Sequence, residues 1–343
     1  MTKTACRLFD EAERKRAASR FPEAIALFLE AKRLSAQDRE LRADCAFSLG
    51  DAYRMTGEFA RAVRCYKEAE KLSLALDSEM RSFDALVGLG LTLRAMGDFK
   101  EAAVIFNRCM RWYKKSGDKA GIAFTLWARA GALRIKGDLA GAIKGFKEAK
   151  AMFAKLSDKS GAGYCLTGLG GASRVAGRPG DSFKYYTGAN KVFRGLKDTF
   201  GVAYSYCGIA NSLRMKGDFK ASLAYFKKAA SNYRKIGDRV SYAYTLWGEG
   251  SGFQMLGRDR DALGDFKEAR RLFKETGDKR GLLYCMISIS QLMFKVEQEK
   301  ASALISGALR AAKKLGLKTE EGYARSVIKA MKKGGDALPL NLA

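Results

Sequence analysis

The stretch SLRMKGDFKASLAYFKKA, residues 212–229, places a Gly-Asp pair between two segments with helical spacing of apolar residues. The same arrangement stands eighty residues earlier as ALRIKGDLAGAIKGFKEA, residues 132–149. Glycine can adopt the left-handed conformation that ends a helix, and aspartate can accept hydrogen bonds from the free N–H groups that begin the next one. We therefore predict two antiparallel helices joined by a tight turn in each stretch.

This turn recurs with a period of forty residues and no insertion. Its copies are Gly57-Glu58, Gly97-Asp98, Gly137-Asp138, Gly177-Arg178, Gly217-Asp218 and Gly257-Arg258. A second marker, an aspartate that can cap the first helix of a unit, recurs in step at Asp118, Asp158, Asp198, Asp238 and Asp278. Two turns per period predict two helices per period, which in one unit cover about 119–135 and about 139–156.

Each predicted helix has one apolar stripe in which small and large residues alternate. In the unit from 118 the stripes are Ala123, Leu126, Ala130 and Leu133 in the first helix and Ala142, Phe146, Ala149 and Phe153 in the second. Neither helix can bury its stripe alone. Stacking of neighbouring units buries both stripes, which predicts a solenoid.

The order Gly90, Leu93, Gly97, Asp98, Phe99, Ala102, Phe106 resembles the tetratricopeptide repeat, in a longer variant with a forty-residue period. The resemblance covers nearly the whole chain. It implies an all-α, right-handed superhelical solenoid of antiparallel helix pairs, with about eight pairs and a C-terminal capping helix. Because most members of the family bind peptides in a concave groove, it also implies a protein-interaction scaffold or adaptor.

The repeat pattern predicts a single solenoid over residues 1–333. Its units cover about 4–37, 38–77, 78–117, 118–157, 158–197, 198–237, 238–277 and 278–317, the first of them incomplete, and a capping helix covers 319–333. Looser sequence after 278 is typical of a capping end. Residues 334–343 are expected to form a flexible tail.

The chain is strongly basic, with 63 basic and 37 acidic residues and a net charge of +26. Residues 118–237 contain 22 basic and 7 acidic side chains, so this segment carries +15 of the total. The charge predicts an acidic partner. With no histidine and no CxxC pair, the sequence favours a non-enzymatic protein without metal or cofactor.

The predicted location of the protein is the cytoplasm. Its seven cysteines are odd in number, no run of about 18 apolar residues could span a bilayer, and residues 1–16 mix charges where a secretory signal needs an apolar core.

One repeat position carries arginine in six units. The series is Arg16, Arg54, Arg94, Arg134, Arg174 and Arg214, and Gln254 ends it. Ten residues earlier in each unit, a second position is occupied in turn by Asp44, Asp84, Phe124, Tyr164, Tyr204, Tyr244 and Tyr284. The family resemblance places both series on the concave groove. Gly131 and Gly171, on the same helix face, are expected to hollow the middle of that groove.

We predict that the partner-binding residues are Arg94, Phe124, Trp127, Arg134, Tyr164, Arg174, Tyr204, Asn211, Arg214, Tyr244 and Trp247. Arginine forks would hold carboxylates of an acidic peptide or protein, while aromatic rings bury apolar side chains. Single-stranded nucleic acid, such as RNA, is the alternative partner, with its bases stacked on the tyrosines.

A structural role for the arginines stays open beside these functional ones. Arg16 and Arg54 could pair with Asp44 and Asp84 of the following units. The arginines from Arg94 to Arg214 could stack on the aromatic residues from Phe124 to Tyr244, as cation–π contacts that tie adjacent repeats together.

Overall fold

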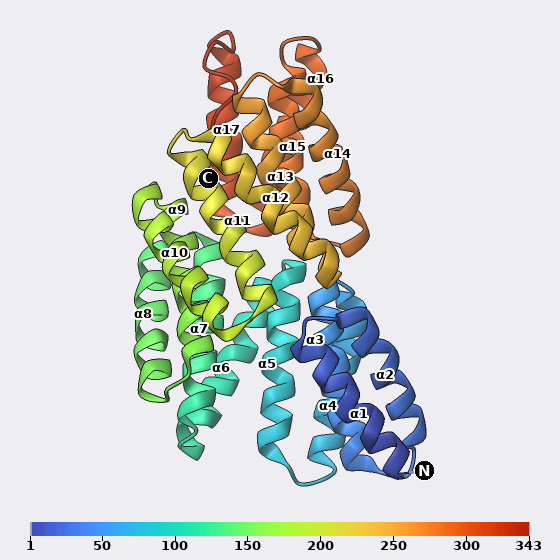
Figure 1. The fold of residues 1–343 in the computed structure, drawn as a ribbon. Coiled ribbons are helices and arrows are strands. Elements are labelled where there is room, and N and C mark those ends of the chain that lie inside the picture. The colour runs from blue at the N-terminus through green and yellow to red at the C-terminus, as the bar shows by residue number, and fades with distance from the viewer. Residues whose placement is uncertain (1, 343) are drawn as a thin grey trace.

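The computed structural model describes residues 2–342, and this part of the chain folds into seventeen α-helices joined by short turns (Figure 1). The helices are α1 (Thr2–Ala17), α2 (Phe21–Leu34), α3 (Arg39–Thr56), α4 (Phe59–Leu74), α5 (Glu79–Met96), α6 (Phe99–Ser116), α7 (Lys119–Lys136), α8 (Leu139–Lys155), α9 (Lys159–Val175), α10 (Pro179–Leu196), α11 (Thr199–Met215), α12 (Phe219–Ile236), α13 (Arg239–Met255), α14 (Asp259–Thr276), α15 (Lys279–Met293), α16 (Gln298–Leu315) and α17 (Lys318–Lys332). The predicted all-α solenoid of eight helix pairs and a capping helix is confirmed.

The turn between α7 and α8 has the predicted chemistry. Gly137 ends α7 in the left-handed conformation, with φ of 87°. The carboxylate of Asp138 then accepts a hydrogen bond of 2.9 Å from the N–H of Gly141 and caps α8. Asp118 caps α7 in the same way through the N–H of Gly121. The two helices therefore begin and end within a residue of the predicted bounds.

Adjacent units interlock by placing a large ring of one unit against a glycine of the next. The buried ring of Phe146 on α8 lies against Gly168 of α9, where a Cβ atom would come 2.4 Å from the ring. Ala130 and Ala142, from the two predicted stripes, are buried in the same cluster. Alternation of small and large residues therefore allows the close packing that the solenoid needs.

The two ends of the chain form complete structural elements. The first unit, expected to be incomplete, is a full pair of helices, α1 and α2. At the other end α17 packs on α15 and α16, and the guanidinium of Arg280 donates a 2.6 Å hydrogen bond to the fully buried Glu320. Within residues 2–342, none of the helices combines the length and the apolar character that crossing a membrane requires.

The solenoid curves so tightly that its N-terminal units meet its C-terminal units. Helix α3 contacts α13, and α7 contacts α17, as the blue and orange helices in the middle of Figure 1 show for the first pair. A Cβ atom at Gly57 would come 2.8 Å from Cγ2 of Val240. Nothing in the repeat pattern predicted these contacts between the two halves of the solenoid.

An apolar cluster reinforces this closure. Phe21 and Ala52, from the first two units, are buried together with Ala203, Tyr233 and Ile236 from the units that follow α10. Burial of these side chains stabilises the closed arrangement, because apolar surface removed from water contributes about 25 cal/mol per Å². We refer to the contacts between α1–α7 and α11–α17 as the closure contacts.

Candidate functional site

The concave face contains two adjoining cavities. The central cavity, of about 310 Å³, has residues of several units in its walls, among them Arg94, Arg134, Arg174, Tyr186, Tyr204, Val240, Asp278 and Tyr284. The aromatic cavity, of about 360 Å³, is bordered by Met55, Leu91, Phe124, Trp127, Tyr164 and Phe200. The two cavities are neighbours, because both are bordered by Arg94, Arg134, Ile135 and Tyr204.

The structure places ten of the eleven predicted site residues in these walls. The central cavity takes Arg94, Arg134, Arg174, Tyr204, Asn211, Tyr244 and Trp247, and the aromatic cavity adds Phe124, Trp127 and Tyr164. Arg214 is the exception, because it is fully buried and its guanidinium is already bound by the tail of the chain.

Arg94 fastens two repeats together. Its Nη1 donates a 3.0 Å hydrogen bond to the carbonyl of Ala128 on α7, and its guanidinium lies 5.6 Å from the ring centroid of Trp127. A Cβ atom at Gly131 would come 2.3 Å from that Nη1. Gly131 borders the aromatic cavity, but the space beside it is partly filled by the arginine of the preceding unit.

The charge on Arg94 persists despite its surroundings. Burial lowers the pKa of Arg94 to about 10, and the nearby guanidinium of Arg134 contributes to the same direction. A pKa of about 10 still leaves the group protonated at neutral pH, so the central cavity keeps a positive charge at this wall.

The first two arginines of the series are held by carboxylates of their own or the following helix pair. Arg16 contacts Glu13 at 2.6 Å and Asp51 at 3.6 Å. Arg54 contacts Asp51 at 3.2 Å and the hydroxyl of Tyr66 at 3.3 Å. An arginine in the last turn of a helix easily reaches a carboxylate three residues before it on the same face.

The predicted pairing of these two arginines with Asp44 and Asp84 is therefore wrong. Asp44 instead lies 3.6 Å from Arg81, and Asp84 accepts a 2.6 Å hydrogen bond from the hydroxyl of Tyr113. The acidic residues at this repeat position thus hold the first helix of a unit against its neighbours without help from the arginine series.

The cation–π contacts form with tryptophans instead of the predicted aromatic series. Arg94 lies over Trp127, and Arg214 lies over Trp247 at 5.5 Å from the ring centroid. In both pairs the stacked ring is 33 residues after the arginine. The residue 33 positions after Arg134 is Thr167, and the residue 33 positions after Arg174 is Cys207. Neither side chain has a ring on which an arginine could stack. The residue 33 positions after each arginine therefore distinguishes the arginines that stack on a tryptophan from those that do not.

Arg134 and Arg174 consequently face the central cavity without a partner. Throughout residues 2–342, neither guanidinium takes part in a hydrogen bond, an ion pair or a cation–π contact, and Nη1 of Arg174 is buried and unsatisfied. Gly171 leaves Arg134 at ordinary contact distance, since a Cβ atom there would lie 3.6 Å from its Nη1. Two unpartnered positive charges thus border the same cavity, where an acidic group would be favoured.

Two tyrosines of the predicted aromatic series connect units. The hydroxyl of Tyr164 donates a 2.8 Å hydrogen bond to Asp198, and that of Tyr244 donates a 3.3 Å hydrogen bond to Asp278. Each of these aspartates caps the first helix of the next unit, at Gly201 and Gly281. Since their rings also pack on phenylalanines at 4.7 Å between centroids, both tyrosines have mainly structural contacts.

Tyr204 differs from these two tyrosines. Its ring stacks on Phe200 at an interplanar angle of 11°, and in the described part of the chain its hydroxyl has no hydrogen-bond partner. It borders both cavities. Tyr204 is therefore placed to contact a ligand that bridges the two spaces, beside Arg134 and Arg174.

Sequence reasoning missed Tyr186 and the residues that the closure contacts supply. Tyr186 occupies the repeat position of Phe146 and Phe226, and tyrosine in place of phenylalanine was an available signal for a polar group at the groove. Val240 also borders the central cavity, and it lies against Gly57 at the closure. No local pattern could have identified this residue.

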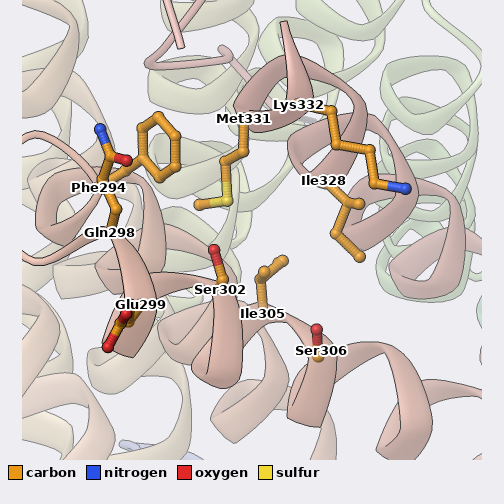
Figure 2. Close-up of a pocket in the computed structure, with 9 residues that line it drawn as sticks. All are labelled: Phe294, Gln298, Glu299, Ser302, Ile305, Ser306, Ile328, Met331 and Lys332. Carbon is orange, nitrogen blue, oxygen red and sulfur yellow. The ribbon is translucent and has the colours of Figure 1, made fainter. Parts of the chain in front are cut away.

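A third pocket, of about 450 Å³, lies at the end of the solenoid between α16 and α17. Figure 2 shows Ile305, Ile328 and Met331 around it, with Ser302 and Ser306 on the α16 side. It shares no residue with the other two cavities and contains none of the predicted site residues. Its position is that of a solenoid end rather than of the concave face.

Comparison with known proteins agrees with the fold. Two tetratricopeptide repeat models match the chain, one over residues 199–276 and the other over residues 43–75 and 83–116. No curated protein matches at the level of sequence.

Three solved structures resemble the chain over most of its length. A Rap protein complexed with competence and sporulation factor has a TM-score of 0.63 at 13% identity, covering 96% of this chain and 98% of that one. NprR in complex with its cognate peptide NprX has a TM-score of 0.61 at 16% identity, with coverage of 84% and 89%. Aspartyl phosphate phosphatase F from Bacillus subtilis has a TM-score of 0.51 at 12% identity, with coverage of 98% and 95%.

Proposed function

This chain is a tetratricopeptide-repeat protein, and from that premise we propose that it is a non-enzymatic scaffold that binds a short acidic segment of a partner protein in its central and aromatic cavities. The observation that carries the proposal is the pair of unpartnered guanidinium groups of Arg134 and Arg174, which lie in the wall of the central cavity within the described residues 2–342.

A carboxylate is the group that best satisfies these arginines. The guanidinium fork matches a carboxylate with two parallel hydrogen bonds, and such charge-assisted bonds are about twice as strong as neutral ones. A carboxylate between Arg134 and Arg174 would also relieve the cost of the unsatisfied Nη1 of Arg174. An aspartate or glutamate side chain of a peptide supplies this group.

The aromatic cavity supplies the place for an apolar neighbour of that acidic residue. Phe124 is 40% exposed although it lies on the concave face, and Trp127, Phe200 and Met55 border the same space. Large apolar surface left open in a concave site contributes to affinity when a side chain fills it. The preferred segment is therefore acidic and apolar, a few residues long.

Peptide binding is a known use of this fold. Two of the similar structures are named as complexes, one of a Rap protein with competence and sporulation factor and one of NprR with the peptide NprX. The proposal transfers only the class of ligand to this chain, since identities of 13% and 16% support a likeness of fold.

Single-stranded nucleic acid finds less support in the same site. Stacking of bases requires free ring faces, and the rings of Tyr164 and Tyr244 pack on phenylalanines.

The proposed absence of enzyme activity rests on the chain itself. It contains no histidine, the commonest general base at neutral pH. Because one similar structure is named a phosphatase, the purified protein should be assayed for hydrolysis of an aspartyl phosphate in a protein substrate, and turnover there would contradict a purely scaffolding role. Cytoplasmic location stays a prediction, and the seven free thiols agree with it.

Fluorescence anisotropy with synthetic octapeptides tests the proposed ligand. Each labelled peptide carries one Asp or Glu among apolar residues, and its control carries Asn or Gln instead. We expect acidic peptides to bind at least about tenfold more tightly than their controls, and Arg134→Glu with Arg174→Glu to abolish this preference. A matched pair on exposed positions, Lys147→Glu with Lys184→Glu, changes the net charge equally and should retain it.

Three results would count against the proposal. Equal loss in both charge-matched pairs would mean that overall charge, and not the cavity, attracts the peptide. A lowered melting temperature in the Arg134/Arg174 pair would mean that these arginines stabilise the fold. Tight oligonucleotide binding with a steep salt dependence, removed by the same pair, would favour nucleic acid as the ligand.

A further inference from the structure

The segment after the last helix folds back onto the concave face. Beyond α17 the chain turns at Gly334 and Gly335, which have φ of 92° and 85°. A Cβ atom at Gly335 would come 2.5 Å from the ring of Phe294, so only glycine lets the chain pass there. In Figure 1 the C-terminal label lies between the labels of α17 and α11, in the upper part of the molecule.

Residues 338–342, which we call the tail segment, are held by side chains of two distant helices. Gln291 on α15 accepts a 2.7 Å hydrogen bond from the N–H of Leu340. Arg214 on α11 donates through Nη2 to the carbonyl of Leu342 at 2.7 Å, and through Nη1 to the amide oxygen of Asn341. The amide of Asn341 donates back to the carbonyl of Arg214 at 2.9 Å.

Every second side chain of the tail segment packs on apolar surface, and the main chain bends between them, since the N–H of Leu342 donates a 3.0 Å hydrogen bond to the carbonyl of Leu340. Leu338, Leu340 and Leu342 pack against the apolar cluster of the last units, which includes Ile287 and Phe294, whereas Asn341 faces Arg214. Main-chain groups are bound by polar side chains and every second residue packs on apolar surface. A groove holds a peptide ligand by the same two kinds of contact.

The subsite that holds the tail segment adjoins the central cavity. The guanidinium of Arg214 lies over Trp247, and its Nη2 is 3.4 Å from Oδ1 of Asn211. Both Trp247 and Asn211 border the central cavity. A peptide that extends from Arg134 and Arg174 towards the C-terminal units therefore reaches positions that the tail segment fills.

We propose that the tail segment is an internal ligand of the groove, which occupies the Arg214 subsite in the free protein and competes with any partner peptide that reaches it. The inference rests on the proposed function, because it treats the concave face as a peptide site. Arg214 differs from Arg134 and Arg174 in being fully buried, and the tail segment is what covers it.

Tethering makes such competition effective. A segment joined to its site by a short flexible linker has an effective concentration in the millimolar range. A free peptide of the same sequence must therefore displace a segment that already occupies most sites. Its apparent affinity is the intrinsic affinity multiplied by the fraction of sites that are open. Release of the tail segment should raise that affinity by at least about tenfold.

The test uses the full chain and a labelled peptide with the sequence of residues 334–343, GGDALPLNLA, measured by fluorescence anisotropy. The release variant carries Leu340→Asp and Asn341→Ala, which remove one apolar contact and the paired bonds to Arg214. We expect it to bind the peptide at least about tenfold more tightly than the unmodified protein. Addition of Arg214→Gln to the release variant should remove this binding. A control with Asp336→Asn and Ala337→Ser changes exposed tail positions and should behave as the unmodified protein.

Two outcomes would overturn the inference. One is equal binding of the peptide by the unmodified protein and the release variant. The other is a release variant that melts at a lower temperature and binds no peptide, which would identify the tail segment as a structural cap. Hydrogen exchange on the unmodified protein gives an independent measurement, since an amide of Leu340 that exchanges as fast as in a free peptide would also refute occupation.

These outcomes are separate from a failure of the proposed function. The probe is the chain's own sequence and its contacts lie at Arg214 and Gln291, so the result does not depend on an acidic residue at Arg134 or Arg174. Loss of acidic-peptide binding with retained tail binding would reject the acidic ligand alone.

Discussion

Gly208 of α11 faces the ring of Tyr186 on α10, and a Cβ atom at Gly208 would come 2.1 Å from Cδ1 of that ring. On its other side the ring lies against Gly170 of α9, where a Cβ atom would come 2.7 Å from Cδ2. The ring is thus held between three helices, which fixes its position in the wall of the central cavity.

Gly208→Ala should destabilise the protein. The new methyl group meets a rigid, buried ring, and overpacking of this kind costs about 1–3 kcal/mol, more than the roughly 1 kcal/mol that alanine gains over glycine in a helix. Guanidinium denaturation measures the difference. Gly264→Ala on α14 is the matched control, because nothing among the described residues lies within 4 Å of its Cβ and it should gain stability. Equal gains in both variants would contradict the packing argument.

Tyr164→Phe should lower stability by about 1–3 kcal/mol, whereas Tyr204→Phe should leave it nearly unchanged. The first change removes a 2.8 Å hydrogen bond to the carboxylate of Asp198 and leaves that carboxylate with one partner fewer. The second removes a hydroxyl that has no hydrogen-bond partner in the part of the chain that the structure describes. Thermal melts of the two variants, recorded side by side, decide this; equal effects would mean that the two tyrosines have the same role.

Gly57→Ala should open the closure contacts. Both Gly57 and Gly217 follow a first helix with positive φ, 82° and 86°, so alanine is strained by about 1 kcal/mol or more at either position. Of the two, only Gly57 would also bring the methyl group against Val240 and Thr276, whereas no described residue lies within 4 Å at Gly217.

Small-angle X-ray scattering separates the two glycine variants. We expect a larger maximum dimension for Gly57→Ala than for Gly217→Ala, together with a larger fall in melting temperature. Identical scattering curves would mean that the closure tolerates the methyl group. The shape of the central and aromatic cavities would then not depend on the contact of Gly57 with Val240.

Asp265→Asn should stabilise the protein at high pH and have little effect at low pH. Burial, reinforced by the carboxylate of Glu249, raises the pKa of Asp265 to about 7, and its Oδ2 is buried without a hydrogen-bond partner among residues 2–342. Because the folded state favours the protonated form, the stability that this group contributes below about pH 4 is lost as the pH rises towards 7.

The side-chain amide of the Asp265→Asn variant stays neutral at every pH and therefore does not lose this stability. Melting temperatures at pH 4 and pH 8 measure the effect, with an expected gain of at least about 1 kcal/mol for Asp265→Asn at pH 8. Asp261→Asn, at an exposed position whose carboxylate pairs with Arg258 at 2.8 Å, is the control and should not gain. A gain for Asp265→Asn that is the same at both pH values would show that ionisation is not its cause.

The arginine series shows where sequence reasoning succeeded and where it stopped. The family resemblance predicted that Arg94, Arg134 and Arg174 share one concave face, and all three border the central cavity. It did not distinguish Arg94, which donates to the carbonyl of Ala128, from Arg134, which has no partner in the described chain. The distinction depends on whether a tryptophan stands 33 residues later, a relation between units that became visible only when their packing was known.

The sequence by itself determined the helices, their caps and the stacking of units, because these depend on contacts between residues close in the chain, such as Asp118 with Gly121. Only the tertiary structure decided the closure and the position of the tail segment. Gly57 meets Val240 and Arg214 meets Leu342 through the accumulated rotation of successive units. The small rotation of each unit relative to the one before it cannot be predicted from a local sequence pattern. After several units, however, it determines which distant side chains share a cavity.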